Sequence, residues 1–370
     1  MPTFTWNVDP VFTTVPKPIV VGVLGLIGLI MMIQGLRKKQ VDAAVVGLLM
    51  CGVGAFLWNR LGDMVPFRYY SLIFVFVFLG GYSLLNWQIR RGGGGKDDAG
   101  DFIVYGVLAV LVGARLGHVL FYDLDKALRD PLWILQIWTG GLASHGAVIG
   151  LTVAMYLFTK FRGIPFLEGA DRFSFSAALG ATLVRVGNLI NSEIVGRPTD
   201  GTWGVIFPRY NEGYEVPVPR HPSQLYEITL GLVVLGSLFL VDRLAGKEKR
   251  PRGLMISTFF AVYFTGRFFT EFFKEFEGIT REQSFLTMGQ WLSIPCAVLG
   301  IAGVIWSLRR RIPAGWVPVD ASGDEGNIED AEDEPLERDE DVDAEFAGDE
   351  ATRRQRQLEA RHQANEGDSE

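Results

Sequence analysis

Long uncharged apolar runs, separated by short polar segments, make up most of the chain. About nine runs can be marked, at 18–36, 42–58, 69–89, 102–121, 144–159, 173–192, 223–241, 253–272 and 288–308. Most approach the ~20 residues that an α-helix needs to cross a bilayer. Helices are the expected form because lipid offers no hydrogen-bond partners to free backbone groups. The pattern predicts an all-α polytopic membrane helix bundle of about nine transmembrane helices.

The loops predict the orientation of this bundle. Every odd-numbered run is followed by a basic segment, the first of them Arg37–Lys39 and the last Arg309–Arg311. Because basic loops remain in the cytoplasm, the N-terminus is expected outside and the C-terminus inside. The loops that follow the even-numbered runs then face outward, and two of them are long, 122–143 and 193–222. These two loops carry most of the unusual polar residues, so we expect an outward-facing site.

Charge divides the chain into two parts. From Asp320 onward there are 20 acidic and 5 basic residues, a net charge of −15, which leaves +8 for the rest of a chain whose formal net charge is −7. A segment with few apolar residues and so much charge cannot bury enough surface to fold. Residues 313–370 are therefore predicted to be a disordered acidic cytoplasmic tail.

The only cysteines, Cys51 and Cys296, lie in apolar runs without metal-ligand spacing. We expect no metal, cofactor or nucleic acid.

The first polar cluster lies at the end of the sixth run. Its residues are Arg185, Asn188, Asn191, Glu193 and Arg197. The first three recur at every third position and so share one face of a helix. An arginine within a membrane span is costly and is by default a candidate for a functional site. The alternative is a structural ion pair of Arg185 with Glu193 or Asp171.

The second cluster is a polar stripe along the eighth run. Tyr263, Arg267, Glu271 and Lys274 lie about one helical turn apart in an otherwise aromatic segment, "YFTGRFFTEFFKE". Such a stripe is expected to face the bundle interior or a wet cavity. Arg185 and Arg267 could converge on one phosphate, which suits the guanidinium fork. The alternative is a buried Arg267–Glu271 salt bridge that needs no ligand.

Two further motifs carry histidines. His145, in "GGLASHGAVIG", either anchors a helix at the water boundary or faces a reactive site. His221 precedes "PSQLYE", where Ser223 and Glu227 are interpreted as local caps at a helix entry. An intramembrane protease using Ser144 and His145 is disfavoured, because adjacent helical residues point about 100° apart and cannot form a nucleophile–base pair.

Several blocks together resemble the phosphatidylglycerol–prolipoprotein diacylglyceryl transferases of bacterial inner membranes. They appear in the order "FTWNVDPVF", "RYYSL", "ARLGHVLFY", "GGLASHGAVIG", "RVGNLINSEIVGRPT", "HPSQLYE" and "YFTGRFFTEFF". The resemblance implies that the diacylglyceryl group of phosphatidylglycerol moves to the lipobox cysteine of a preprolipoprotein signal peptide. A thioether forms and glycerol phosphate departs, in the first step of lipoprotein maturation. The partners implied are therefore membrane lipid and exported peptides.

The resemblance also implies roles for individual residues. Three are expected to act in catalysis, His145, Arg267 and Arg185, with the histidine as the base for the thiol or as a positioning group. The substrate-binding residues are expected to be Arg185, Asn188, Glu193, Gly196, Arg197, Tyr263, Tyr70, Asp171 and Lys274. A thiol of pKa near 8.5 must ionise before it reacts. An imidazole is suited to that task.

The chain departs from this pattern in two places. Residues 16–62 hold two extra apolar runs, read as an inserted transmembrane hairpin between an outward N-terminal segment, 1–15, and a transferase membrane domain, 63–312. Lys274 stands where the family often has arginine, so it keeps the charge and loses the bidentate fork. Two alternatives stay open, a transporter and a degenerate family member that binds phospholipid without transferring it. Turnover separates both from an enzyme.

Overall fold

Each predicted apolar run forms a helix in the part of the chain that the structure describes. The structure is a computed structural model, and it describes residues 3–37, 41–210, 218–275 and 285–316. The helices of the nine runs are α1 (Lys17–Arg37), α2 (Val41–Trp58), α3 (Tyr69–Arg91), α4 (Asp98–Tyr122), α6 (Ser144–Arg162), α7 (Phe166–Ile190), α8 (Ser223–Leu244), α9 (Leu254–Thr270) and α10 (Met288–Arg310). Among the described residues, six helices (α1, α3, α4, α7, α8 and α10) are long and apolar enough to cross a membrane. The predicted polytopic helix bundle is confirmed, and the count of nine crossings stays a prediction.

Short elements that the apolar pattern does not predict complete the fold. They are β1 (Phe4–Thr5), β2 (Val11–Pro16), β3 (Met64–Arg68), β4 (Val205–Ile206), α5 (Leu124–Arg129) and the 3-10 turns η1 (Pro131–Leu135), η2 (Ile137–Thr139) and η3 (Lys247–Lys249). Strand β2 pairs antiparallel with β3, and β1 pairs parallel with β4. The sequences of β2 and β3, "VFTTVP" and "MVPFR", are rich in the β-branched and aromatic residues typical of strands.

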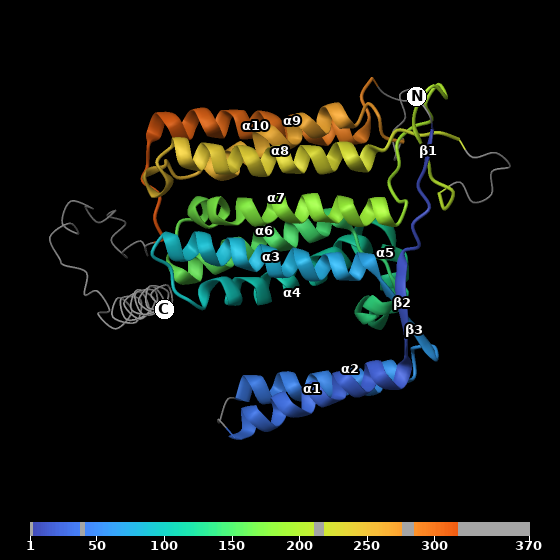
Figure 1. The fold of residues 1–370 in the computed structure, drawn as a ribbon. Coiled ribbons are helices and arrows are strands. Elements are labelled where there is room, and N and C mark those ends of the chain that lie inside the picture. Colours follow the sequence, from blue (N-terminus) through green and yellow to red (C-terminus); the bar gives the residue numbers. More distant parts are fainter. Residues whose placement is uncertain (1–2, 38–40, 211–217, 276–284, 317–370) are drawn as a thin grey trace, which may run out of the picture. The chain divides into compact units, whose positions relative to one another are not determined.

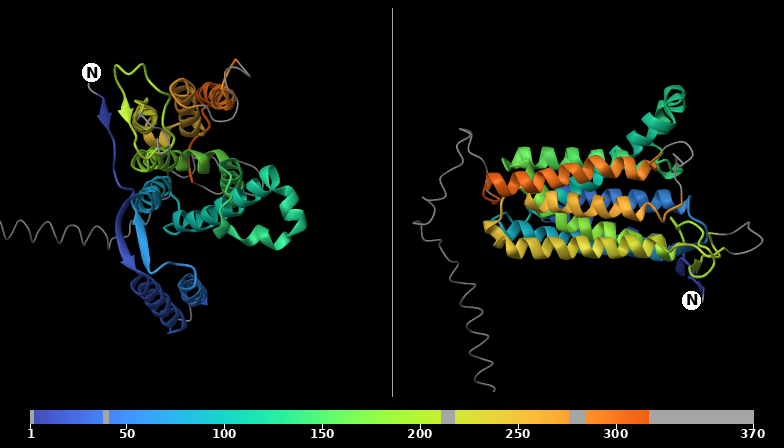
Figure 2. Two further views of the ribbon diagram at one scale, coloured as in Figure 1. Left: turned by 90° about the vertical axis from the view of Figure 1, so that its right-hand side faces the viewer. Right: turned by 90° about the horizontal axis from the view of Figure 1, so that it is seen from above.

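Apart from the short α5, the helices from α3 to α10 lie side by side and alternate in direction (Figure 1). α3, α6, α8 and α10 begin at one end of the bundle, where α4, α7 and α9 finish, because short turns join most of the helices in sequence. We call this end the Arg185 end, and the other the Arg172 end. The segment of α5, η1 and η2 projects sideways from the bundle (Figure 2).

Glycines allow several helix pairs to approach to backbone contact. A Cβ on Gly146 of α6 would lie 2.1 Å from the carbonyl oxygen of Gly113 on α4. A Cβ on Gly300 of α10 would lie 2.2 Å from the Ala261 nitrogen of α9. In the α1–α2 hairpin, a Cβ on Gly47 would lie 2.4 Å from the Met32 nitrogen. Small residues of this kind drive association where water supplies no hydrophobic force.

The Arg172 end is held by a network of buried ions. Arg172 contacts Glu168 at 2.7 Å and Glu248 at 2.5 Å, and both Arg172 and Glu168 are fully buried. Arg91 pairs with Asp242 at 2.6 Å and with Glu248 at 2.5 Å. The network therefore connects α3, α7, α8 and η3 through ion pairs. Burial without a partner would be costly for each of these groups.

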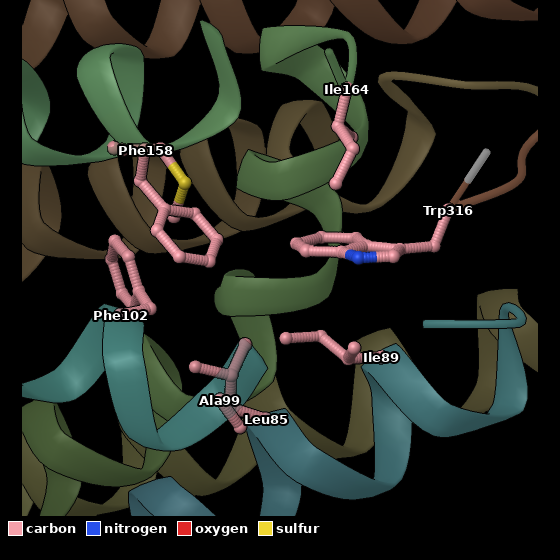
Figure 3. Close-up of a cluster of buried hydrophobic side chains, with 8 residues drawn as sticks. Leu85, Ile89, Ala99, Phe102, Phe158, Ile164 and Trp316 are labelled. Atoms are coloured by element: carbon pink, nitrogen blue, oxygen red, sulfur yellow. The ribbon is translucent and has the colours of Figure 1, made fainter. Parts of the chain in front are cut away.

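The residues after α10 cross this end of the bundle. The backbone of Ala314 donates to the Arg250 carbonyl, and the Trp316 backbone donates to Gly92. The Trp316 ring packs among Ile89, Phe158 and their neighbours (Figure 3), and its indole nitrogen donates to Asp98 at 2.8 Å. Residues 313–316, which the sequence analysis assigned to the disordered tail, thus pack on the bundle because Trp316 finds an apolar pocket. Residues 317–370 lie outside the described part.

Candidate active site

One carboxylate joins the two arginines expected to form the site. Arg185 of α7 places Nε 2.9 Å from Oε2 of Glu227, and Arg267 of α9 places Nη1 3.3 Å from Oε1 of the same residue. Glu227 lies on the first turns of α8, and only 5 % of its surface is exposed. The structural partners weighed from the sequence, Glu193 and Asp171 for Arg185 and Glu271 for Arg267, are therefore not the ones that these arginines contact here.

The amide and carboxylate beyond Arg185 continue this network. Arg185 Nη1 donates to Oδ1 of Asn188 at 3.0 Å, and Asn188 Nδ2 donates to Oε2 of Glu193 at 3.3 Å. Asn191 Nδ2 donates to the other oxygen of Glu193 at 3.2 Å. Helix α7 ends at Ile190, so Asn191 is its C-cap rather than a member of the helical face. The chain of contacts fixes the Arg185 guanidinium from a second direction.

A strained turn presents Glu193. Ser192 and Ile194 adopt positive φ angles of 57° and 54°, which is uncommon for residues other than glycine and costly for a β-branched side chain. The start of α8 holds the turn in place: Ser223 Oγ donates to the Ile194 carbonyl at 2.7 Å, and Gln224 Nε2 donates to the Glu193 carbonyl at 2.7 Å. Strain of this kind persists only where the surroundings over-determine it.

Gly196 and Arg197 connect this turn to the end of α9. A Cβ on Gly196 would lie 2.4 Å from the His221 carbonyl oxygen and 2.6 Å from that of Phe273, so only glycine fits. Arg197 Nε donates to the Lys274 carbonyl at 2.6 Å. The pKa of the His221 imidazole is lowered by its burial and by the positive charge of Arg197.

Lys274 adds a third cation to the network. Its ammonium lies 3.9 Å from Oε1 of Glu227 and 4.0 Å from Oε2 of Glu271, and only 4 % of the residue is exposed. Glu271 also accepts a hydrogen bond from Thr287 Oγ1 at 3.2 Å, at the start of α10. Three helices and the turn after α9 therefore meet at Glu227.

The two predicted tyrosines lie on either side of this network. The Tyr70 ring of α3 packs against Gly187 of α7, where a Cβ would lie 2.6 Å from it, and so lies next to Asn188. Tyr263 lies one turn before Arg267 on α9 and stacks on Phe259, with ring centroids 5.3 Å apart. The structure thus places Tyr70 next to the polar network and Tyr263 in the aromatic packing beside it.

His145 lies at the same end of the bundle but apart from Glu227. It occupies the first turn of α6, beside the close glycine contact of Gly146 with α4. The backbone of Ala143 donates to the Ala114 carbonyl at 2.9 Å, which fixes the entry to this helix. His145 is exposed, and no residue in the described part of the chain forms a hydrogen bond or ion pair with its imidazole. The side chain is available to a molecule outside the bundle.

Asp171 does not lie near the other predicted site residues. It is fully buried near the start of α7, and its carboxylate accepts from the backbone nitrogens of Gly253 at 2.6 Å and Ile256 at 2.9 Å. Fourteen residues separate it from Arg185, about 21 Å along the helix. Asp171 therefore caps the start of α9 at the Arg172 end, away from Arg185, and its part in substrate binding stays a prediction that this position does not favour.

Sequence reasoning missed the central residue, Glu227. The motif "HPSQLYE" was interpreted as a helix entry, and Ser223 and Glu227 as local caps. In the structure neither caps α8: Ser223 binds the Glu193 turn, and Glu227 faces the arginines. The available signal was the position of Glu227, one turn inside an apolar run. A carboxylate there requires a cationic partner, just as an intramembrane arginine requires an anionic one.

Comparison with known proteins identifies the family to which this site belongs. Residues 57–306 match the family model described as prolipoprotein diacylglyceryl transferase. Among similar proteins, the phosphatidylglycerol–prolipoprotein diacylglyceryl transferase of Cupriavidus necator is 40% identical over 256 residues, which cover 67% of this chain and 91% of that protein. Those of Pseudoalteromonas atlantica and Vibrio cholerae are each 38% identical, over 66% of this chain and over 86% and 89% of their own lengths. The chain is a multi-pass membrane protein that belongs to the prolipoprotein diacylglyceryl transferase family.

Proposed function

We propose that the chain transfers the diacylglyceryl group of phosphatidylglycerol to the lipobox cysteine of a preprolipoprotein. The cysteine sulfur forms a bond to the glyceryl carbon that bears the phosphate, and the bond from this carbon to the phosphate oxygen breaks. Glycerol phosphate leaves with the bonding electrons, and the thiol proton passes to a base. The reacting thiol belongs to the substrate, which agrees with the apolar surroundings of Cys51 and Cys296.

The observation that carries this proposal is the charge balance around Glu227. Arg185, Arg267 and Lys274 surround it, and Glu271 is the second carboxylate of the group. Three cations share these two carboxylates, and Glu193 reaches Arg185 only through Asn188. The group around Glu227 therefore keeps a positive charge that the single negative charge of a phosphodiester would balance. Guanidinium forks bind phosphate oxygens in two parallel hydrogen bonds. The phosphate would thus sit at the two arginines, which stabilise the charge that develops on the leaving oxygen.

Glu227 would act as a positioning residue for both guanidiniums. Because one carboxylate contacts Arg185 and Arg267 together, the two forks are held at a fixed separation before the lipid arrives. Asn188 and Glu193 hold Arg185 from the other side, with Tyr70 next to Asn188. Preorganised donors of this kind avoid reorganisation during the reaction. Gly196 and Arg197 would keep the end of α9, and so Lys274, in register.

His145 would serve as the base for the incoming thiol. Its exposed imidazole at the Arg185 end is reachable by a peptide that approaches from outside the bundle. A positioned base of this kind contributes about 10² to 10⁴ in rate. The proposal places the Arg185 end on the outer face of a bacterial inner membrane, with the N-terminus outside, where exported peptides arrive. The basic exits of the odd-numbered runs support this orientation.

The direct test is turnover with two matched peptides. Purified full-length protein is given phosphatidylglycerol and a lipobox peptide that carries either cysteine or serine. We expect a diacylglyceryl mass gain on the cysteine peptide alone, with an equal amount of glycerol phosphate released. Bound phosphatidylglycerol without mass gain or release would contradict transfer and favour a lipid-binding or transport protein.

A further inference from the structure

An apolar cavity of about 550 Å³ lies outside the Glu227 network, between α3, α4 and α7. Helix α3 packs closely on α7 and only loosely on α4, and this difference leaves the space. Gly81, Gly106 and Gly180, one from each helix, line it. Phe74 and Tyr82 stand at its rim with 36 % and 39 % of their surfaces exposed, so the cavity opens toward the surrounding lipid.

Tyr70 links this cavity to the proposed phosphate site. The ring of Phe74, at the rim, contacts the ring of Tyr70 with centroids 5.3 Å apart. Tyr70 also packs against Gly187 of α7, next to Asn188, which accepts a hydrogen bond from Arg185. Along α7, Gly180 lies five residues from Arg185, about 7.5 Å deeper in the bundle. A chain attached to a molecule held at Arg185 would have to span about this distance to reach the cavity.

The cavity has the length of a lipid chain. On α3 its lining runs from Phe74 to Leu85, which corresponds to about 16 Å of helix. One leaflet occupies about half of the ~30 Å hydrocarbon core, so the two lengths agree. A signal-peptide helix is about 10 Å wide, and a segment of this length would need more than twice the volume of the cavity. The size favours a single acyl chain.

We propose that this cavity holds an acyl chain of the phospholipid donor while its phosphate lies at Arg185 and Arg267. This inference rests on the proposed transferase function. It makes the walls of α3, α4 and α7 a determinant of which phospholipids are used, because a chain that fills the cavity buries more apolar surface than a short one. A donor with long chains would then bind better than one whose chains end before the cavity.

The first test fills the cavity and compares donors. In Gly180→Leu, the new Cβ lies an ordinary 3.6 Å from Val77, so the rest of the side chain extends into the cavity without a backbone clash. The matched control is Gly236→Leu on α8, where nothing lies within 4 Å of the new Cβ. Phosphatidylglycerol with two palmitoyl chains is compared with the form that carries two octanoyl chains.

We expect Gly180→Leu to raise KM for the palmitoyl donor about tenfold, since displacing roughly two buried methylene groups has that effect on affinity. KM for the octanoyl donor and all constants of Gly236→Leu should stay near those of the unmodified protein. Equal effects on both donors, or no effect on either, would overturn the proposal. If the unmodified protein turned over neither donor, the transferase function itself would fall, and the cavity would be judged by labelling.

The labelling experiment uses the unmodified protein and so does not depend on a variant that folds. Phosphatidylglycerol with a diazirine at the end of one palmitoyl chain is photolysed in its presence, and the labelled peptides are sequenced. We expect label in 102–111 and 173–180, reduced by excess palmitoyl donor, and reduced by octanoyl donor only at a higher concentration because the two donors share the phosphate site. Label confined to other helices would overturn the proposal. Labelling of these same segments by a lipobox peptide with a diazirine in its apolar part would assign the cavity to the signal sequence instead.

Discussion

At the scale of single residues, Glu227 organises the site because it is buried and faces three cations. A carboxylate in this environment stabilises the charged forms of its neighbours and is stabilised by them in turn. Its distances to Arg185, Arg267 and Lys274 are 2.9, 3.3 and 3.9 Å. The two shortest contacts are to the guanidinium groups of Arg185 and Arg267, whose geometry suits a phosphate. The longest contact is to the ammonium group of Lys274, which cannot form two parallel hydrogen bonds.

Glu227→Gln should separate binding from turnover. The amide keeps the shape of the side chain but removes the charge that holds the two guanidiniums. We therefore expect phosphatidylglycerol to bind at least as well as to the unmodified protein. We expect kcat to fall about 100-fold, a typical loss when one preorganised element of charge stabilisation is removed. Lipid binding and peptide mass gain are measured on the same preparation. The matched control is Glu275→Gln, which removes a carboxylate that pairs with Arg220 instead. Unchanged kcat in Glu227→Gln would remove Glu227 from the mechanism.

The sequence alone could identify the arginines but not their partner. Arg185 and Arg267 are conspicuous because a charge inside an apolar run is rare and costly. Glu227 follows a proline–serine helix entry, and the same local pattern fits an ordinary start of a helix. The separation of Asp171 from Arg185 was hidden for a related reason: position in sequence does not reveal that α7 begins at Phe166 and places Asp171 at the far end of the bundle. Tertiary placement decided both.

At the scale of elements, contacts between glycines set the spacing of α4 and α6. A Cβ on Gly113 would lie 2.3 Å from the Gly146 carbonyl oxygen and 2.9 Å from Cα of Gly150. The contact also fixes the start of α6, on which His145 stands. The lengths of the apolar runs predicted where these helices lie, because span length follows from bilayer thickness. Which helices touch was not predictable, since one glycine pattern suits many partners.

Gly113→Ala should destabilise the protein, and Gly100→Ala on the same helix should not. A methyl group at Gly113 would collide with the backbone of Gly146 and Gly150 on α6. Overpacking of this kind lowers the free energy of unfolding by about 1–3 kcal/mol. Nothing lies within 4 Å of a Cβ on Gly100, where alanine improves helix propensity. Thermal unfolding in detergent compares the two variants. Equal melting temperatures would show that α4 and α6 do not meet through Gly113.

At the scale of the whole molecule, the two ends of the bundle carry different kinds of charge network. The Arg172 end is a network of ion pairs in which Arg172 and Glu168 are fully buried. The Arg185 end has three cations around Glu227 and Glu271, and the exposed His145 lies at the same end, apart from Glu227. The first arrangement stabilises the fold, and the second leaves a charge for a ligand. The basic loops predict which end faces outward, and that orientation stays a prediction.

Glu248 should make the stability of the Arg172 end depend on pH. Burial alone raises the pKa of its carboxyl, but the hydrogen bond from Arg172 and the charges of Arg172, Arg250 and Arg91 outweigh that effect, so the pKa is lowered. The stabilisation is therefore present above the ordinary glutamate pKa and is lost as the pH falls through the lowered value. Compared with Glu248→Gln, the unmodified protein should melt a few degrees higher near neutral pH. The difference should vanish in acid, and a constant difference across the range would contradict this origin.

The central claim is that Arg185 and Arg267 hold the phosphate whose oxygen leaves, and the most direct measurement is the release of glycerol phosphate by Arg267→Ala. Both peptide mass gain and release are followed with phosphatidylglycerol and a lipobox cysteine peptide, beside Arg243→Ala, whose residue lies in the last turn of α8 at the other end of the bundle. The account predicts that Arg267→Ala inserts and folds normally yet loses transfer, while Arg243→Ala keeps it. Near-normal turnover in folded Arg267→Ala would contradict the account.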